Sequence, residues 1–406
     1  MARFGDGFAA DADLVRAAES AAAEALRPLA GRRPDLACIF VSGSDTDAVA
    51  EAGARAAMAV GALSTIGCNA PGVIGSGRAA ESMSAVSVWC AVLPDVRART
   101  FHLEAMPATS GLAVVGMPER LPDDVVGVLL ADPWSFPIDG FIERSNDALD
   151  GLPLVGGIAA GARGRGSTRL FLDGSTVDRG AVGVLLGGPV GARAFVSQGC
   201  RPIGPAMTVT AADGNLIIEL AGTPAITKLE EILSTLDAQS QALATTGLQI
   251  GVAMDDYAEE HVQGDFLIRG IAGSEASNGG LIVGEVVAVG RTVQFQLRDA
   301  AAADADLRDA LKRFRESAGL DTIEGALLFS CNGRGAQLFA RADHDVTMVR
   351  EGLATDGVAG FFAAGEIGPV AGRNHVHGLT AAVLAFGSGA VAERGTRQAA
   401  RPAVDG

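Results

Sequence analysis

The stretch LACIFVSGSDTDAVAEAGARAAMAVGALSTIGCNAPGVIG, residues 36–75, holds in order most of the elements that recur along this chain. Leu36–Ser42 is a short apolar run that is typical of a buried strand. An acidic cap at Asp45 begins a helix-like stretch that ends before Gly61. A glycine-punctuated stretch follows, and the apolar run Ala85–Leu93 predicts a closing strand. These features predict one unit of strand, helix, glycine turn and strand.

The same order returns twice more along the chain. The matching segments are Val125–Ala131, Asp139–Leu149, Leu154–Gly161 and Ala181–Leu186, and then Ala326–Ser330, Asp343–Leu353, Gly360–Pro369 and Leu379–Phe386. Residues 248–297 contain four more strand runs, which we interpret as a divergent fourth unit, and a helix is expected over Ala300–Phe314. The alternative, that the repeat is a coincidence of Gly/Ala-rich composition, stays open.

Alternating strands and helices predict an α/β fold. We expect two related α/β domains built from these repeated units, at residues 11–204 and 205–392, with a disordered tail at 393–406. The boundary is placed at Pro202–Pro205, where Arg-Pro-Ile-Gly-Pro interrupts every period. A cleft between the two domains is the expected binding site.

The charge of the chain excludes some partners. Acidic side chains outnumber basic ones by 48 to 32 over 406 residues, which gives a net charge of −16. Such a field repels phosphate backbones and anionic head groups, so we expect neither a nucleic-acid nor a membrane partner. No signal-peptide pattern and no run of about 18 apolar residues occurs. We therefore expect a cytoplasmic protein.

The sequence lacks the residues and motifs that several common enzyme classes require. The five cysteines show no C-x-x-C spacing, which favours free thiols in a reducing compartment. Lys228 and Lys312 are the only lysines, and neither follows a glycine as a phosphate-binding loop requires. Both lie in charged helical settings, which argues against a Schiff-base lysine. No G-x-S-x-G motif occurs. We expect no cofactor.

The densest cluster of unusual residues is SCNGRG, residues 330–335, directly after an apolar strand run. Open α/β sheets bind ligands at this carboxyl end of their strands. Glycines beside Arg334 allow backbone N–H groups to approach an anion that the guanidinium also binds. Asn332 lies in the same turn. For Cys331 two interpretations stay open, a reactive thiol and a packed core residue.

Glu366 lies in the turn GEIGP, residues 365–369, among small and apolar neighbours. A carboxylate that is desolvated there needs a raised pKa or a cationic partner, and Arg334 or a ligand amine would serve. The alternative is a surface turn in which Glu366 faces water.

Two further stretches supply candidates. NHVHGLT, residues 374–380, contains Asn374 and places His375 and His377 on one face if the segment is extended. A histidine pair can bind a metal ion, but no further ligand set accompanies it, so we expect no metal. Cys68 lies in a glycine turn that resembles the setting of Cys331, and it is either a second site residue or a core residue.

With these motifs in hand, the chain resembles the FIST family over about residues 34–390. The resemblance rests on residues 66–75 for an N-terminal FIST region and on residues 330–335, 360–369 and 374–380 for a C-terminal one. It implies a sensory module that binds small ligands, such as amino acids. Family members are fused to bacterial signalling domains or occur in a eukaryotic F-box protein. We expect a stand-alone FIST chain, because no such output segment is evident.

Three functions remain open at this stage. The first is a sensor that binds an amino-acid-like ligand and signals through a protein partner; its candidate contacts are Cys331, Asn332, Arg334, Glu366, Asn374, His377 and Cys68. The second is an enzyme in which Cys331 is the nucleophile and His377 its base, in acyl or amidine transfer. The third is a scaffold without a small ligand. A homo-oligomer is compatible with all three.

Overall fold

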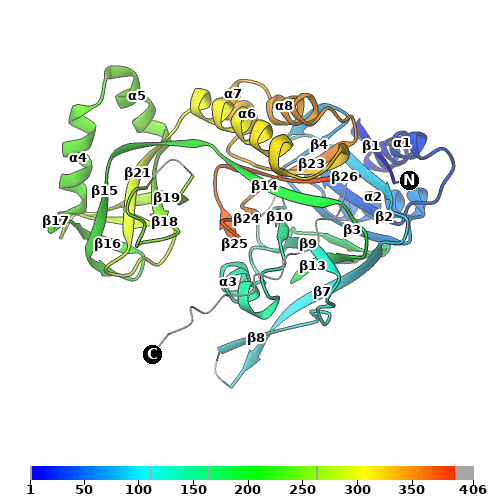
Figure 1. Ribbon diagram of the computed structural model, residues 1–406, viewed down its shortest axis with the longest axis horizontal. Helices are drawn as coiled ribbons and strands as arrows, with labels where there is room; N and C mark the ends of the chain where they lie inside the picture. The colour runs from blue at the N-terminus through cyan, green and yellow to red at the C-terminus, as the bar shows by residue number, and fades with distance from the viewer. Residues whose placement is uncertain (1, 110, 162–163, 262–263, 389–406) are drawn as a thin grey trace, which may run out of the picture.

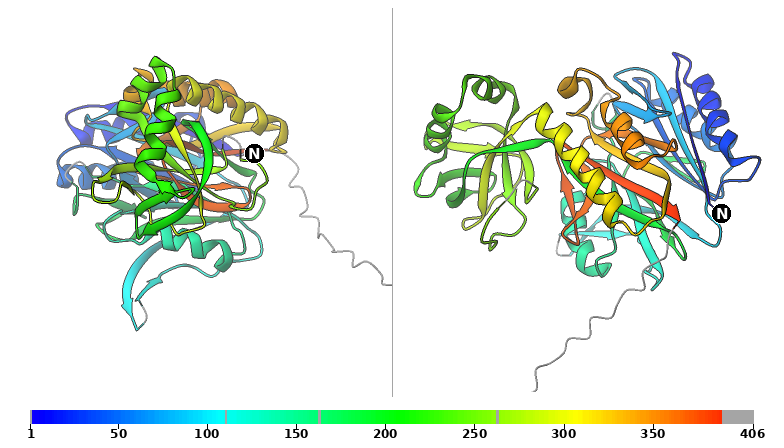
Figure 2. Two further views of the ribbon diagram at one scale, coloured as in Figure 1. Left: turned by 90° about the vertical axis from the view of Figure 1, so that its left-hand side faces the viewer. Right: turned by 45° about the horizontal axis from the view of Figure 1, so that its top comes forward.

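The computed structural model describes residues 2–109, 111–161, 164–261 and 264–388. Three sheets with helices on their outer faces form a body, and a fourth sheet forms a separate lobe beside it (Figure 1 and Figure 2, right). The lobe comprises residues 200–298, and the body comprises the described residues on either side of it. The expected tail, 393–406, lies outside the described residues.

The body contains three units of one design. The elements of the first are β1 (Arg3–Ala10), α1 (Leu14–Leu26), a short 3₁₀ turn (Arg27–Leu29), β2 (Leu36–Ser42), α2 (Thr46–Val60), β3 (Ser64–Asn69), β4 (Gly72–Gly75), β5 (Arg78–Glu81) and β6 (Ala85–Val92). The elements of the second are β7 (Arg97–Ala108), β8 (Gly111–Val115), β9 (Asp124–Ala131), α3 (Ile138–Ala148), β10 (Leu154–Ile158), β11 (Leu170–Leu172), β12 (Ser175–Val177) and β13 (Ala181–Gly187). The elements of the third are β14 (Ala192–Gln198), α6 (Ala300–Ser317), β22 (Thr322–Cys331), α7 (Gly335–Phe339), α8 (His344–Leu353), β23 (Val358–Ala363), β24 (Glu366–Val370), β25 (Arg373–His377) and β26 (Thr380–Ser388).

The three sheets share one strand order. They read β1-β6-β2-β3-β11-β12, then β7-β13-β9-β10-β24-β25 with β8 added beyond β7, then β14-β26-β22-β23-β4-β5. In each, the two strands that flank a helix pair in parallel, and the closing strand runs antiparallel to the first of them. The three glycine stretches thus fall in equivalent places, because each begins within the second strand of its unit and runs on toward or into the hairpin that follows. The repeated unit predicted from the sequence is present three times.

Each hairpin leaves its own unit and joins another sheet. The β4–β5 hairpin of the first unit pairs with β23, the β11–β12 hairpin of the second pairs with β3, and the β24–β25 hairpin of the third pairs with β10. The units are therefore interlocked, which differs from the expected two domains meeting face to face. Position 204 lies within a single strand, β15 (Cys200–Asp213). Local pattern could not show this exchange, because a hairpin looks the same whichever sheet edge it joins.

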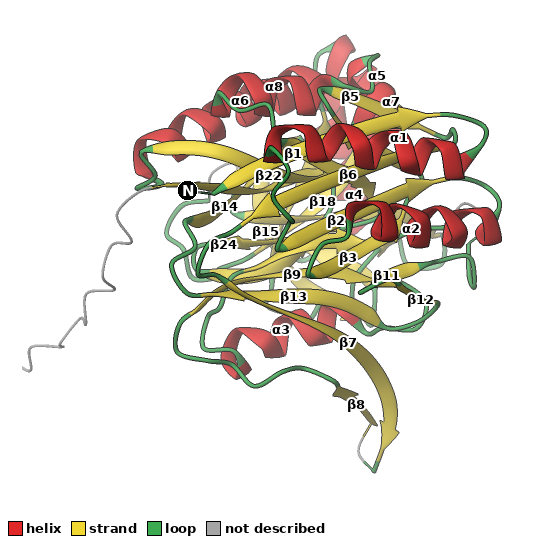
Figure 3. Cartoon of the chain, turned by 90° about the vertical axis from the view of Figure 1, so that its right-hand side faces the viewer, coloured by secondary structure: helices red, strands yellow, loops and turns green. Residues whose placement is uncertain are grey.

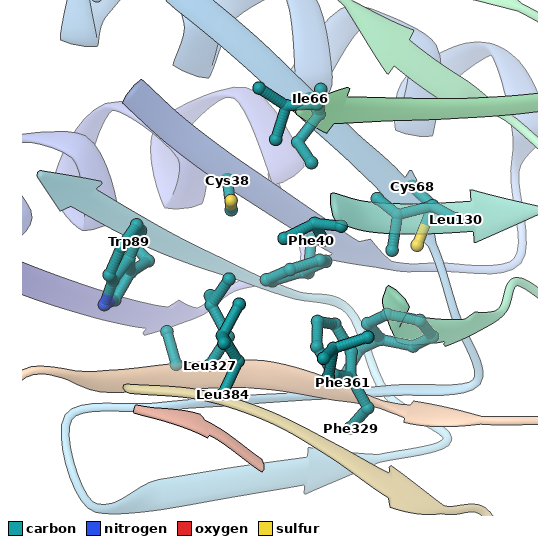
Figure 4. Packing of buried hydrophobic residues seen from close by; sticks show 14 of the residues in the cluster. Cys38, Phe40, Ile66, Cys68, Trp89, Leu130, Leu327, Phe329, Phe361 and Leu384 are labelled. Carbon is teal, nitrogen blue, oxygen red and sulfur yellow. The ribbon is translucent and has the colours of Figure 1, made fainter. Parts of the chain in front are cut away.

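Helices cover the outside of the body, and aromatic side chains fill its centre. Figure 3 shows α1 and α2 on the sheet of the first unit, α6 and α8 on that of the third, and α3 on that of the second. The inner faces of the three sheets meet in one core. There the rings of Phe40 and Phe361, from the first and third units, lie 5.1 Å apart (Figure 4). Burial of such rings is a main source of stability.

The lobe is built differently from the three units. Its elements are β15, β16 (Leu216–Leu220), β17 (Thr223–Pro224), α4 (Ala225–Thr235), α5 (Ala238–Gly247), β18 (Leu248–Ala253), β19 (Phe266–Glu275), β20 (Gly280–Val283) and β21 (Thr292–Arg298). The four strands expected in residues 248–297 are present, but all pair antiparallel, and the sheet closes on itself because β15 pairs with both β21 and β16. The interpretation as a fourth unit was wrong, since no helix connects parallel strands among the described residues of this lobe.

Candidate functional site

The motifs SCNGRG and GEIGP meet at the carboxyl edge of two parallel strands. Cys331 is the last residue of β22, and Glu366 begins β24 shortly after β23 ends at Ala363. The N–H of Asn332 donates to the carbonyl of Ala363 at 2.8 Å, which holds the two turns together. Cys331, Arg334, Asp345, Glu366 and Thr380 form what we call the junction cluster. Its place is the one that the strand pattern predicted.

Glu366 is a fully buried carboxyl group that is only half satisfied. Its Oε2 accepts hydrogen bonds from the backbone N–H and the hydroxyl of Thr380, at 3.0 and 2.8 Å. Its Oε1 is buried and has no hydrogen-bond partner among the described residues. Burial raises the pKa of Glu366 to about 8, although the bonds from Thr380, the charge of Arg334 and an interaction with the thiol of Cys331 oppose the rise. The expected desolvation is confirmed, and the alternative of a surface turn is wrong.

Arg334 has a partner that the sequence analysis missed. Its Nε and Nη2 donate to the two carboxylate oxygens of Asp345 at 2.7 and 3.0 Å. Burial alone would raise the pKa of Asp345, but the charge of Arg334 and hydrogen bonds from His344 and Ser330 lower it well below its usual range. The remaining nitrogen, Nη1, makes one hydrogen bond among the described residues, a long one of 3.5 Å to the carbonyl of Leu379. Asp345 carries no local signal, since it is one of many acidic residues on exposed-looking helices.

Cys331 is a protonated thiol in this setting. It is 6% exposed, and the backbone N–H of Gly333 donates to its Sγ at 3.5 Å. Burial, reinforced by Glu366, raises the pKa of Cys331 above its usual range, and the charge of Arg334 only partly opposes this. Because Asp345 compensates Arg334, the guanidinium does not activate the thiol as a nucleophile requires.

His377 is buried and neutral. It lies opposite Glu366 in the β24–β25 pair, and its Nε2 donates to the carbonyl of Gly368 at 3.0 Å. Burial lowers the pKa of His377 to about 3. Within the described ranges no hydrogen bond joins His377 to Cys331, so the structure does not form the Cys–His pair of the enzyme hypothesis.

Two other candidate residues, Asn374 and Asn332, lie apart from one another. The side chain of Asn374 bonds the backbone of Leu152 and Leu154 at 2.9 Å each, and its backbone bonds Asn146 of α3. These hydrogen bonds hold β25 against the second unit. Both polar atoms of the Asn374 side chain, Oδ1 and Nδ2, have a backbone partner. Asn332 is exposed beside the junction cluster.

Cys68 lies in the shared core rather than in a turn. It is within β3, fully buried, and paired with Phe40 and Leu170 (Figure 4). Burial raises its pKa well above the usual value. Its strand corresponds to β23, whereas Cys331 ends β22, so the two cysteines are not structural counterparts. The similarity of their surroundings was one of composition.

The lobe covers the junction cluster. A Cβ placed on Gly199, where the chain enters the lobe, would lie 2.3 Å from the carbonyl oxygen of Leu379 and 3.0 Å from Nη1 of Arg334. Leu379 itself packs on the lobe residues Cys200, Ala253, Phe266 and Ile268. The cluster is therefore enclosed between body and lobe, and only glycine at position 199 permits this approach.

The described residues contain no group of three or more His, Cys, Asp or Glu side chains that could hold a metal ion. The two histidines of β25 have ring centroids 5.9 Å apart. No helix in the same residues is long and apolar enough to cross a bilayer.

Comparison with known proteins now identifies the family. The FIST N domain model matches residues 35–223, and the FIST C domain model matches residues 225–369. The chain belongs to the FIST family. An uncharacterized protein of Mycobacterium tuberculosis (strain ATCC 25618 / H37Rv) is 45% identical over 385 residues, which cover 95% of this chain and 99% of the relative. An uncharacterized protein of Mycobacterium bovis is 43% identical over 386 residues, covering 95% and 98%. The two FIST matches divide inside the lobe, at β17.

Proposed function

We propose that this FIST chain is a sensor that binds a small, amino-acid-like ligand at the junction cluster. The observation that carries the proposal is the buried Oε1 of Glu366 without a partner. An unsatisfied buried polar atom costs about 1–3 kcal/mol and is rare in native proteins. A ligand ammonium or amide N–H that donates to this oxygen would remove the cost.

The other cluster residues suit the opposite end of such a ligand. Asp345 occupies Nε and Nη2 of Arg334, while Nη1 has only its 3.5 Å contact with Leu379. A carboxylate could accept from Nη1 without breaking the ion pair. Thr380 holds Glu366 in place through two hydrogen bonds, and the neutral Cys331 thiol supplies a small, weakly polar wall.

Enclosure of the site supports a sensing role. Glu366 and Arg334 are fully buried, so a ligand can enter only if the lobe backbone at Gly199 or the Leu379 turn moves. Bound and free states would then differ in the position of the lobe, which a protein partner could recognise.

A thermal-shift screen over amino acids and related metabolites tests the proposal. A ligand at 100 times its Kd adds about 2.7 kcal/mol to the free energy of unfolding. The hit is then titrated by calorimetry into the wild type, Glu366→Gln and the exposed control Glu316→Gln. We expect binding to be lost in the first variant and retained in the second.

Proton release gives a second measurement. A ligand cation next to Glu366 should drive its carboxyl group to ionise, so binding at pH 7 should release up to about one proton, measured in buffers of different ionisation enthalpy. A screen without hits would leave the scaffold hypothesis instead, and unchanged affinity in Glu366→Gln would place the binding site elsewhere in the chain. The enzyme hypothesis is not favoured by any contact of Cys331.

A further inference from the structure

The second unit carries an arm where the first has a helix. In the first unit α1 follows the edge strand β1, and in the third α6 lies before β22. In the second unit the edge strand β7 instead continues into a hairpin with β8. Figure 3 shows this hairpin extending away from the body. We call residues 104–115 the arm.

One edge of the arm is open. Among the described residues β8 pairs with β7 alone. Pro107 lies opposite Leu112 and has no N–H, so these two residues form a non-hydrogen-bonded pair. The backbone groups of Leu112, and by alternation those of Val114, therefore point away from β7. These outward-facing N–H and C=O groups can form backbone hydrogen bonds with another strand.

The composition of the arm is unusual for an open edge. Residues 105–118 contain no charged side chain, although the chain has a net charge of −16. Met106, Leu112 and Val115 are 51%, 54% and 43% exposed. Natural sheets normally protect a free edge with charges, and β8 has none. A second copy of this acidic chain would meet no side-chain charge on this strand.

We propose that β8 is the edge through which two copies of this chain pair, antiparallel and around a two-fold axis. One register uses the outward-facing backbone groups of both Leu112 and Val114. In it, Ala113 lies opposite Ala113 of the second copy, and Leu112 lies opposite Val114 of the second copy. All five residues of β8 then pair, and the two seven-stranded sheets become one continuous sheet. A two-fold interface of this kind is self-complementary. Because the arm buries a small area, we expect a dimer of micromolar Kd.

Sedimentation velocity between about 1 and 200 μM, a range chosen around that affinity, measures the association. The wild type should shift from monomer to dimer. Leu112→Lys places a charge on the edge and should remain monomeric. Leu63→Lys, at an apolar residue that is 61% exposed elsewhere, should dimerise like the wild type. A wild type that stays monomeric throughout, or a Leu112→Lys variant that still dimerises, would overturn the proposal.

Cross-linking tests the register. All five native cysteines are buried, so one added surface cysteine is distinguishable. Across a non-hydrogen-bonded pair the Cα atoms are about 4.5 Å apart, within reach of a disulfide. Ala113→Cys should therefore form a covalent dimer under mild oxidation, whereas Met83→Cys, at a residue that is 52% exposed, should not. Equal cross-linking of the two variants would contradict pairing through β8.

Discussion

Arg334 and Asp345 form a bidentate ion pair in which both side chains are almost completely buried. The exposed fractions are 0% and 4%, and the shorter bond is 2.7 Å. The pair compensates the guanidinium, and the charge of Arg334 opposes the rise in the pKa of Glu366 only in part. Burial is the largest effect and leaves Glu366 as a neutral acid with a pKa of about 8.

Removing the carboxylate of this pair should cost much stability. Asp345→Asn keeps the shape of the side chain but leaves Arg334 charged and unpaired in the interior, which costs about 3–5 kcal/mol. Urea unfolding measures the loss. The control is Asp178→Asn, which removes an exposed partner of Arg179 and should have little effect. Equal losses in the two variants would show that the buried pair has no special role.

Glu366 should make stability fall with rising pH. Its folded-state pKa of about 8 lies above the ordinary value of 4.5, so the folded state keeps a proton that the unfolded state releases. The stabilisation is complete below about pH 4.5, declines by up to about 1.4 kcal/mol per pH unit, and is lost above about pH 8. Unfolding of wild type and Glu366→Gln from pH 5 to 9 measures this. The wild type should lose stability relative to the variant, and parallel curves would contradict the raised pKa.

Two helix glycines should respond to alanine in opposite directions. A Cβ on Gly53 of α2 would lie 2.3 Å from the ring of Phe171, which belongs to the β11–β12 hairpin of the second unit. Gly53→Ala should therefore destabilise the fold by about 1–3 kcal/mol through overpacking. Gly140→Ala in α3 meets nothing within 4 Å and should stabilise by about 0.5–1 kcal/mol. Thermal unfolding of both variants checks the exchanged hairpin, and a neutral Gly53→Ala would argue against it.

Cys331 should react with alkylating reagents before Cys38 and Cys90. Cys331 is 6% exposed at a strand end, whereas the other two are fully buried within strands. The order rests on access alone, since burial raises the pKa of all three thiols. Mass spectrometry after limited alkylation at pH 8 gives the order. Earlier labelling of Cys38 or Cys90 would contradict the enclosed but reachable position of Cys331.

Parts of the site could be predicted because their signals are local. The strand run before SCNGRG placed that motif at the carboxyl edge of a strand, and the small and apolar neighbours of Glu366 indicated a desolvated carboxylate. Asp345 could not be identified, because its pairing with Arg334 depends on how α8 is rotated against β22. Cys68 was misplaced, since glycines of similar spacing occur both inside a strand and in a turn.

The sequence by itself determined the repeated unit. Apolar runs such as Leu36–Ser42 and the cap at Asp45, which accepts from the N–H groups of Asp47 and Ala48, act within a few residues of chain. Only the tertiary structure decided which sheet each hairpin joins, that residues 200–298 close into a lobe over Glu366, and that Arg334 is compensated by Asp345. These outcomes depend on contacts between distant segments, where several apolar edges or charges of similar local sequence compete and the packing of the whole chain selects one.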